Sequence, residues 1–143
     1  MANQRRPDCI FCQIVEGRAS AHVVDDDERT LVFMDIFPVA DGHTLIIPKR
    51  HCDDLFAADP EDLRAVVTRS HQVAAAIRRV IAPDGLGVFQ LNGAAAGQTV
   101  FHYHMHLIPR NAGDSLQIHS RKPGDPERLA EVASALKAAL ADD

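Results

Sequence analysis

The spacing of apolar residues predicts where helices and strands lie along the chain. Apolar positions recur every three to four residues over 60–82 and 126–141, and an Asp-Pro pair typical of a helix start opens each stretch. A shorter helix is expected over 8–17, with Asp8 as its cap and Gly17 at its end. Short apolar runs bounded by turn residues predict strands at 22–24, 30–34, 44–47, 86–91 and 102–107.

The order of these elements indicates an α+β fold. We expect an antiparallel sheet of about five strands with the helices packed on it. A chain of 143 residues is long enough for one domain with its own core. We therefore expect a single domain over 1–143, with residues 1–7 disordered and a C-terminal helix at 126–141.

Three of the eight histidines alternate with apolar residues in the last predicted strand. In an extended strand residues two apart lie on one face, so His102, His104 and His106 share a face and the residues between them face the core. Imidazole binds metals when neutral, titrates near pH 6.5 and can act as a nucleophile. The pattern alone leaves open a metal site or a set of groups for attack on an electrophile. Isolated histidines are more typical of structural positions, which is our interpretation of His22, His71 and His119.

Composition argues against several classes of protein. The formal net charge of −5 and a pI near 5.8 are unlike those of a nucleic-acid binder, which needs a basic face. No apolar run approaches the roughly 20 residues that span a bilayer, and no apolar segment follows the charged start as in a signal peptide. Three cysteines, an odd number, do not suggest a disulfide framework. We therefore expect a cytoplasmic protein that binds neither membrane nor nucleic acid.

The segment around the three histidines also carries a family resemblance. Residues 97–108 read Gly-Gln-Thr-Val-Phe-His-Tyr-His-Met-His-Leu-Ile. This run resembles the motif of the histidine-triad family, in which three histidines alternate with apolar residues after a Gly-Gln-Ser/Thr-Val segment. Further matches occur at 33–36, at 42–51 and at Asn92, so the resemblance covers roughly residues 8 to 112. It implies the histidine-triad fold, a homodimer and hydrolysis of a purine nucleotide conjugate.

The resemblance implies a role for each matching residue. The middle histidine, His104, would attack the α-phosphorus of the nucleotide, and water would then release the nucleoside monophosphate from the nucleotidyl-histidine. His106 and His43 are the other catalytic candidates. The positions that match substrate-binding residues are Asp35 for the ribose, Asn92 for the phosphate or ribose side, Gln98 and Thr99 for the phosphate, and Ile10, Phe11, Ile14 and Leu45 for the purine.

A pair of cysteines has the spacing of metal ligands. Cys9 and Cys12 form a C-x-x-C, which by itself also fits a redox pair or two buried thiols. Many bacterial members of the resembled family carry this pair and hold zinc with two further histidines, which here match His51 and His102. The resemblance thus implies a structural zinc site with two sulfur and two nitrogen ligands, the composition of a closed tetrahedral site.

Departures from related motifs narrow the activity. A third histidine in place of glutamine argues against nucleotidylyltransferases, and no zinc finger follows the triad as in DNA-adenylate repair enzymes. Nucleoside phosphoramidases and diadenosine polyphosphate hydrolases remain: residues 107–114 resemble the second class, whereas the loop 92–98 resembles the first. Two other hypotheses are a non-catalytic nucleotide-binding module and a metalloenzyme that uses all three triad histidines as ligands.

The homodimer has some support from the sequence itself. A sheet of about five strands has edges that need covering. The helix over 60–82 has alanine at 65, 74, 75 and 76, which offers a small-residue surface for close packing. The alternative is that the C-terminal helix from Pro126 covers that surface within one chain.

Overall fold

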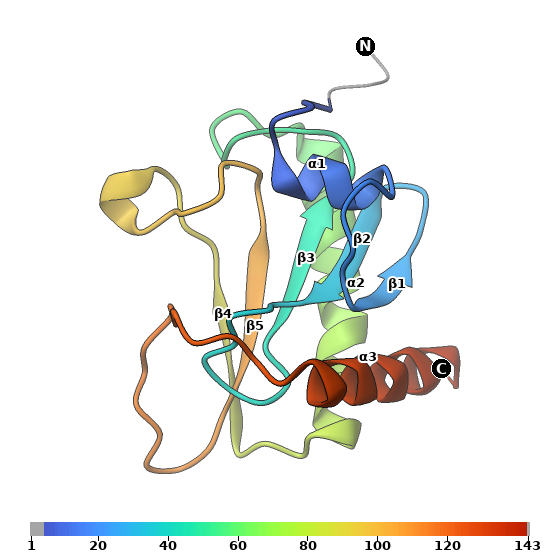
Figure 1. Ribbon diagram of the computed structural model, residues 1–143, viewed down its shortest axis with the longest axis vertical. Helices are drawn as coiled ribbons and strands as arrows, with labels where there is room; N and C mark the ends of the chain where they lie inside the picture. Colours follow the sequence, from blue (N-terminus) through green and yellow to red (C-terminus); the bar gives the residue numbers. More distant parts are fainter. Residues whose placement is uncertain (1–4, 143) are drawn as a thin grey trace.

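The computed structural model describes residues 5–142, which form a five-stranded sheet with three helices. The strands pair antiparallel in the order β1-β2-β3-β5-β4 (Figure 1). The expected α+β fold with a five-stranded antiparallel sheet is therefore confirmed. In chain order the elements are α1 (Ile10–Val15), β1 (Val23–Asp26), β2 (Thr30–Met34), β3 (Thr44–Pro48), α2 (Pro60–Val80), β4 (Gly85–Phe89), the 3₁₀ turn η1 (Ala94–Ala96), β5 (Met105–Arg110) and α3 (Pro126–Ala141).

Helices cover both faces of the central strands. Figure 1 shows α1 in front of the sheet and α2 behind it. Alternate residues of β2 point to opposite faces: Val32 and Met34 join the core under α2 and α3, whereas Leu31 and Phe33 join a smaller core with α1. Every residue of β2 and β3 is buried as a result.

The helix boundaries differ from the predicted ones by one turn or less. The cap of α1 is Cys9, whose sulfur accepts a hydrogen bond from the backbone N–H of Cys12 at 3.3 Å, so the expectation of Asp8 as the cap was wrong. Asp59 caps α2 as expected. This helix ends at Val80 because Ala82 adopts a positive φ of 52° ahead of a proline.

The histidine segment is only partly a strand, because β5 begins at Met105. Before that point the backbone N–H of Tyr103 bonds to the carbonyl of Cys52, in the loop after β3, instead of to β3 itself. The prediction that the strand already runs through His102 was therefore wrong. The alternation survives nevertheless, since the residues that separate the histidines still join the helix-side core: Tyr103, Met105 and Leu107.

The chain between β5 and α3 contains no helix or strand, and we call residues 111–124 the return segment. It crosses back on the α1 side of the sheet before α3 starts (Figure 1). The guanidinium of Arg110 donates to the carbonyls of Ser115 and Gln117, which fixes the first part of the segment. The backbone N–H of Gly124 donates to the carbonyl of Ile36 at 2.8 Å, which fixes its end.

Two further expectations concern the ends of the chain and the membrane. Disorder was expected for residues 1–7; residues 1–4 lie outside the described part, and the carbonyl of Pro7 accepts a hydrogen bond from Gln13. Among the helices formed by residues 5–142, none combines the length and the apolar character that crossing a bilayer requires.

Candidate functional site

A cavity of about 700 Å³ lies between α1, the sheet and the return segment. This volume is in the range of small-molecule sites. One part of its wall is apolar and contains Phe11 and Leu45, while another carries Asp35 and two triad imidazoles, His104 and His106. The cavity therefore joins an apolar surface to a set of polar groups, as a nucleotide would require.

Most of the sequence-predicted site residues meet in this cavity. The predicted residues that line the cavity are Ile10, Phe11, Ile14, Asp35, Leu45, Thr99, His104 and His106. Three others stand apart from the lining. His43 lies behind His106, whereas Gln98 and Asn92 hold the neighbouring loops.

His104 is held in one tautomer. Its Nδ1 lies 2.7 Å from the backbone carbonyl of His102, and because a carbonyl can only accept, Nδ1 carries the proton. The lone pair is therefore on Nε2. The ring of Phe11 packs edge-on against the imidazole, with the centroids 5.2 Å apart. Burial lowers the pKa of His104, which keeps the ring neutral at pH 7 and Nε2 available as a nucleophile.

A hydrogen-bond chain fixes the opposite tautomer on His106. The backbone N–H of Val39 donates to Nδ1 of His43 at 3.1 Å, so His43 carries its proton on Nε2. That Nε2 lies 2.9 Å from Nδ1 of His106, which must accept. His106 consequently has its proton on Nε2 and can donate it to a ligand. Asp35, His43 and His106 also lie within metal-binding distance of one another, but the hydrogen bond occupies the ring lone pairs, so we interpret them as a hydrogen-bond chain.

Burial keeps this chain neutral. It lowers the pKa of His43 to about 3 and that of His106 to about 3, and for His43 the charge of Arg110 acts in the same direction. The Oδ2 of Asp35 lies 3.4 Å from Nε2 of His43, and with a neutral imidazole this contact is not an ion pair. Burial also raises the pKa of Asp35.

Stability should consequently fall in mild acid. Below pH 6.5 the unfolded chain protonates His43 and His106, but the folded chain does so only near pH 3, so the unfolded state binds more protons between these limits. The free energy of unfolding therefore decreases as the pH falls from about 6.5 towards 3. We expect a lower melting temperature at pH 4.5 than at pH 7, with a smaller difference in His43→Gln. A melting temperature independent of pH in this window would contradict the assigned neutral pair.

Gln98 and Asn92 lie beside the cavity and organise its loops. The buried amide of Gln98 accepts from the backbone N–H of Gly93 at 2.7 Å and donates to the carbonyl of Asp53 at 2.6 Å. Asn92 accepts from the backbone N–H of Leu55 at 2.7 Å. Both side chains therefore hold the loop 92–98 against the loop after β3, and they do not themselves line the cavity.

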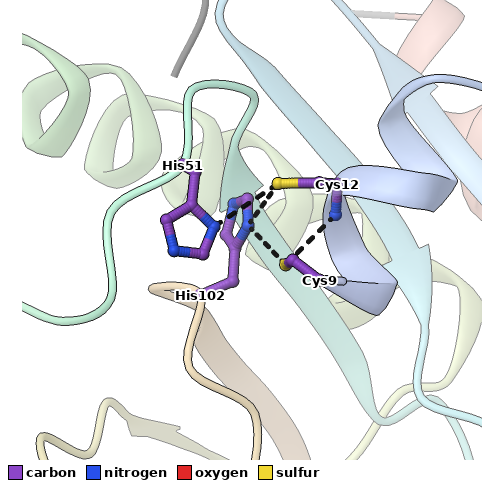
Figure 2. Close-up of side chains that lie close together, drawn as sticks. All are labelled: Cys9, Cys12, His51 and His102. Atoms are coloured by element: carbon purple, nitrogen blue, oxygen red, sulfur yellow. Dashed lines mark hydrogen bonds between the residues drawn. The ribbon is translucent and has the colours of Figure 1, made fainter. Parts of the chain in front are cut away.

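The four predicted metal ligands lie together at the start of α1 (Figure 2). Cys9 and Cys12 come from the start of α1, His51 from the loop after β3, and His102 from the segment before β5. All four ligand atoms lie within 4.8 Å of one another. The sulfur–Nδ1 distances are 3.4 Å for Cys9–His102, 3.6 Å for Cys12–His102 and 3.4 Å for Cys12–His51.

The geometry and the tautomers of this cluster fit zinc. Bonds of about 2.3 Å to sulfur and 2.0–2.1 Å to nitrogen in a tetrahedron place sulfur and nitrogen roughly 3.5 Å apart. Nε2 of His102 donates to the carbonyl of Pro48 at 2.8 Å, and Nε2 of His51 donates to Asp53 at 2.7 Å. Both histidines therefore turn a lone pair on Nδ1 towards the sulfurs, with the outer nitrogen held as in metal sites of proteins.

Burial makes the charge of the Cys12 sulfur depend on a neighbouring cation. Burial raises the pKa of the Cys12 thiol to about 11, so this thiol stays protonated at pH 7 unless a cation compensates its charge. A bound metal supplies that compensation and displaces the proton. The remaining cysteine, Cys52, is buried outside the cluster.

The three triad imidazoles do not converge on one point. Nδ1 of His102 faces the cysteines, Nδ1 of His104 faces a backbone carbonyl, and Nδ1 of His106 faces His43. Within residues 5–142, no group of potential metal ligands contains all three. This arrangement argues against the hypothesis of a metalloenzyme that binds its metal with the whole triad.

Sequence reasoning missed the part of the wall formed by the return segment. The cavity lining includes Ile118, His119, Ser120 and Arg121. His119, interpreted from the sequence as structural, donates from Nε2 to the carbonyl of Gly97 at 2.7 Å, and its ring centroid lies 6.4 Å from that of His106. The segment has no hydrophobic period, so no signal in the sequence indicated which of its side chains face the cavity.

Comparison with known proteins agrees with this geometry. The family model of the HIT domain matches residues 16–113, so the chain belongs to the histidine-triad (HIT) family. A Hit-like protein from Bartonella henselae, involved in cell-cycle regulation, has 36% sequence identity and a TM-score of 0.88, over 96% of this chain and 99% of that one. The resemblance deduced from the triad motif is therefore confirmed.

Two further relatives have a bound metal or a named activity. A zinc-bound histidine-triad protein from Mycobacterium smegmatis is 40% identical, with a TM-score of 0.83 over 94% of each chain. Adenylylsulfatase HINT3 from Arabidopsis thaliana is 36% identical over 121 residues, which are 80% of this chain and 61% of that protein.

Proposed function

We propose that this protein is a hydrolase that cleaves a purine nucleotide conjugate at the α-phosphate through a nucleotidyl-His104 intermediate. The observation that carries the proposal is the pair of complementary tautomers in the cavity. His104 has a lone pair on Nε2, and His106, whose ring centroid is 4.8 Å away, has a proton on Nε2. A nucleophile thus lies beside a hydrogen-bond donor, the combination that displacement at phosphorus needs.

The cavity wall suits a purine nucleoside. The apolar residues of α1 and the sheet offer two sides of a slot for the base: Ile10, Phe11, Ile14 and Leu45. Asp35 accepts from the backbone N–H of Phe37 through Oδ1, and its other oxygen faces His43. A carboxylate fixed in this way can accept hydrogen bonds from ribose hydroxyls, and Thr99 can donate to a phosphate oxygen.

In the first step Nε2 of His104 attacks the α-phosphorus. A nitrogen–phosphorus bond forms, the bond from phosphorus to the leaving group breaks, and its electron pair departs with the leaving group. The Nε2–H of His106 donates to a phosphate oxygen, where it stabilises the developing charge. Nδ1 of His104 keeps its proton, which is hydrogen-bonded to the carbonyl of His102. The imidazole ring therefore becomes cationic as it is nucleotidylated.

In the second step water attacks the same phosphorus. The nitrogen–phosphorus bond breaks, its electron pair returns to Nε2, and the water loses a proton to the solvent as the nucleoside monophosphate forms. His104 ends neutral with the lone pair on Nε2, as it started. Splitting the displacement into two steps is the advantage of a covalent nucleophile.

We also propose that Cys9, Cys12, His51 and His102 hold a structural zinc ion, supported by the sulfur–nitrogen distances and by the zinc-bound relative. Zinc would supply a cross-link between α1, which carries Phe11 of the cavity, and the segment that leads into β5. His102 belongs to both sites, because its ring faces the cysteines and its carbonyl orients His104. The zinc site should therefore affect catalysis only by positioning Phe11 and His104.

Hydrolysis in water labelled with oxygen-18 tests the reaction. Adenosine 5′-phosphoramidate and diadenosine tetraphosphate should each yield adenosine monophosphate with the label on its phosphate, because water attacks the α-phosphorus. Label in the other product would show attack elsewhere. Tight nucleotide binding without any release of monophosphate would instead support the non-catalytic binding module.

We propose that the protein is a homodimer whose two chains pair through the sheet edge that β4 forms. Among residues 5–142 this strand pairs only with β5, and Val88 on it is 54% exposed. Between β4 and α2 lies a groove whose wall includes Ala74 and Ala75. Within the chain α3 packs against α2 and the shared core contains Ala76, so the C-terminal helix covers only part of the alanine surface.

Light scattering at micromolar concentration should return twice the 15.6 kDa mass of the chain. Val88→Lys should shift the protein towards monomers, because it places a charge on the pairing edge. Leu116→Lys, at a residue that is 75% exposed in the return segment, is the matched control and should leave the mass unchanged. A single-chain mass at all concentrations would rule out the dimer and leave the chemistry untouched.

A further inference from the structure

The return segment brings a permanent positive charge to the cavity wall. Arg121 is the only lysine or arginine among the described residues that line the cavity. It makes no hydrogen bond or ion pair with any residue of the described range 5–142. Other arginines are engaged: Arg50 pairs with Asp59 and Asp62, and Arg128 with Asp41. A free guanidinium at a cavity wall is a ready partner for an anion.

The backbone that carries Arg121 is held beside the catalytic imidazoles. Two residues earlier, His119 donates from Nε2 to the carbonyl of Gly97, and its ring lies next to that of His106. At the end of the segment Gly124 packs so closely on Pro38 that a Cβ atom would come within 2.9 Å of its ring. These contacts fix the path of the segment before any ligand binds, so Arg121 does not need a large rearrangement to reach the cavity.

The free Nδ1 of His119 adds a second polar group to the same part of the wall. Since Nε2 carries the proton that bonds to Gly97, Nδ1 of the neutral ring holds a lone pair. The hydroxyl of Ser120, which also lines the cavity, donates to the carbonyl of Lys122 at 3.5 Å and accepts from its backbone N–H at 3.1 Å. A neutral amine has no charge with which the adjacent guanidinium of Arg121 can pair, whereas an oxyanion has one.

We propose that Arg121, supported by His119, forms a leaving-group subsite, and that the substrate class is a nucleotide joined through a bridging oxygen to an anionic group, such as a polyphosphate or a sulfate. The proposal rests on the proposed function, because it concerns the other product of the same displacement. As His104 attacks, the bond between the α-phosphorus and the bridging oxygen breaks and its electron pair moves to that oxygen. Arg121 pairs with the charge of the departing oxyanion, so this leaving group needs no proton. An amine leaving group instead needs a proton and gains nothing from the guanidinium.

Three substrates with different leaving groups test the subsite: diadenosine tetraphosphate, adenylyl sulfate and adenosine 5′-phosphoramidate. The wild-type protein should have the highest kcat/KM on one of the two oxyanion conjugates. Arg121→Gln should lower kcat/KM on that conjugate about 10- to 100-fold more than on the phosphoramidate, the size of one charged hydrogen bond. Whether the polyphosphate or the sulfate is preferred distinguishes the two sources of the anion.

Lys122→Gln is the matched control, because it removes the neighbouring charge on a side chain that faces a different surface of the protein. In this variant the ratio of kcat/KM on the preferred oxyanion conjugate to kcat/KM on the phosphoramidate should stay within about threefold of wild type. Equal losses in Arg121→Gln on both kinds of substrate, or a wild-type preference for the phosphoramidate, would overturn the subsite while the proposed hydrolysis stands. Failure of the wild-type protein to release adenosine monophosphate from any of the three would overturn the proposed function itself.

Discussion

Replacing His104 by alanine should lower turnover by at least about 10³-fold, as loss of a covalent nucleophile does in other enzymes. Neither His106 nor His43 offers a lone pair on Nε2. His106 has its proton on Nε2, because its Nδ1 accepts from His43, and His43 lies behind it. A residue that binds substrate equally in the ground and transition states would raise KM alone, whereas the loss expected here is in kcat.

Nucleotide binding and folding should survive this change. The apolar slot, Asp35 and Thr99 remain in place in His104→Ala, so the dissociation constant for adenosine monophosphate should stay within about tenfold of wild type. Isothermal titration gives the binding constant, and single-turnover kinetics give the chemical step. His71→Ala, at an exposed position of α2, is the control and should behave as wild type. Turnover of His104→Ala near the wild-type rate would exclude covalent catalysis by this residue.

Loss of the metal cluster should have the largest effect on stability. The purified protein should contain about one zinc ion per chain, and Cys12→Ser should lower both the zinc content and the melting temperature, the latter by about 5–15 °C. The reason is that zinc binds the folded arrangement of four ligands and not the unfolded chain, so its binding free energy adds to that of folding. Elemental analysis and calorimetry measure the two quantities.

Cys52→Ser is a close control for that experiment. Cys12 and Cys52 are both buried, with exposed fractions of 0% and 9%, but only Cys12 belongs to the cluster. Exchange of sulfur for oxygen therefore has a similar packing cost at both sites, and the difference between the two variants reports the metal. Zinc-free protein in which both variants melt at the same temperature would refute the structural zinc.

The architecture could be predicted from the sequence because buried strands and helices show a recognisable spacing of apolar residues. Residues 30–34 and 44–47 were predicted as strands and form β2 and β3, where alternate side chains enter the two cores. Burial also explains why the helix from Pro60 was recognised: its apolar stripe faces the sheet, and Asp59 caps its first turn.

The errors lie where a side chain and not a period determines the backbone. The cap of α1 is a cysteine, whose sulfur is directed by its neighbours in the cluster, and propensity favours Asp8 at such a position. The late start of β5 has a similar origin, because the backbone at Tyr103 pairs with the loop after β3 while the ring of His102 donates to Pro48.

The candidate site was predicted only as far as the family motif extends. The positions that matched the motif meet in the cavity or in the metal cluster, apart from Gln98 and Asn92, which hold loops beside it, and His43, which lies behind His106. Arg121 and His119 could not be found, because an irregular segment has no face that can be deduced from spacing. Only the three-dimensional path of the return segment brings them to the wall.

Mass spectrometry of the protein after rapid quench tests the central claim most directly. During a single turnover of adenosine 5′-phosphoramidate or diadenosine tetraphosphate, the wild-type chain should gain the mass of one adenylyl group, and peptide mapping should locate it on His104. The adduct should disappear at the rate at which adenosine monophosphate is released, and it should be absent from His104→Ala. Release of adenosine monophosphate from a chain that remains unmodified at every time point, or an adduct on another residue, would contradict the account.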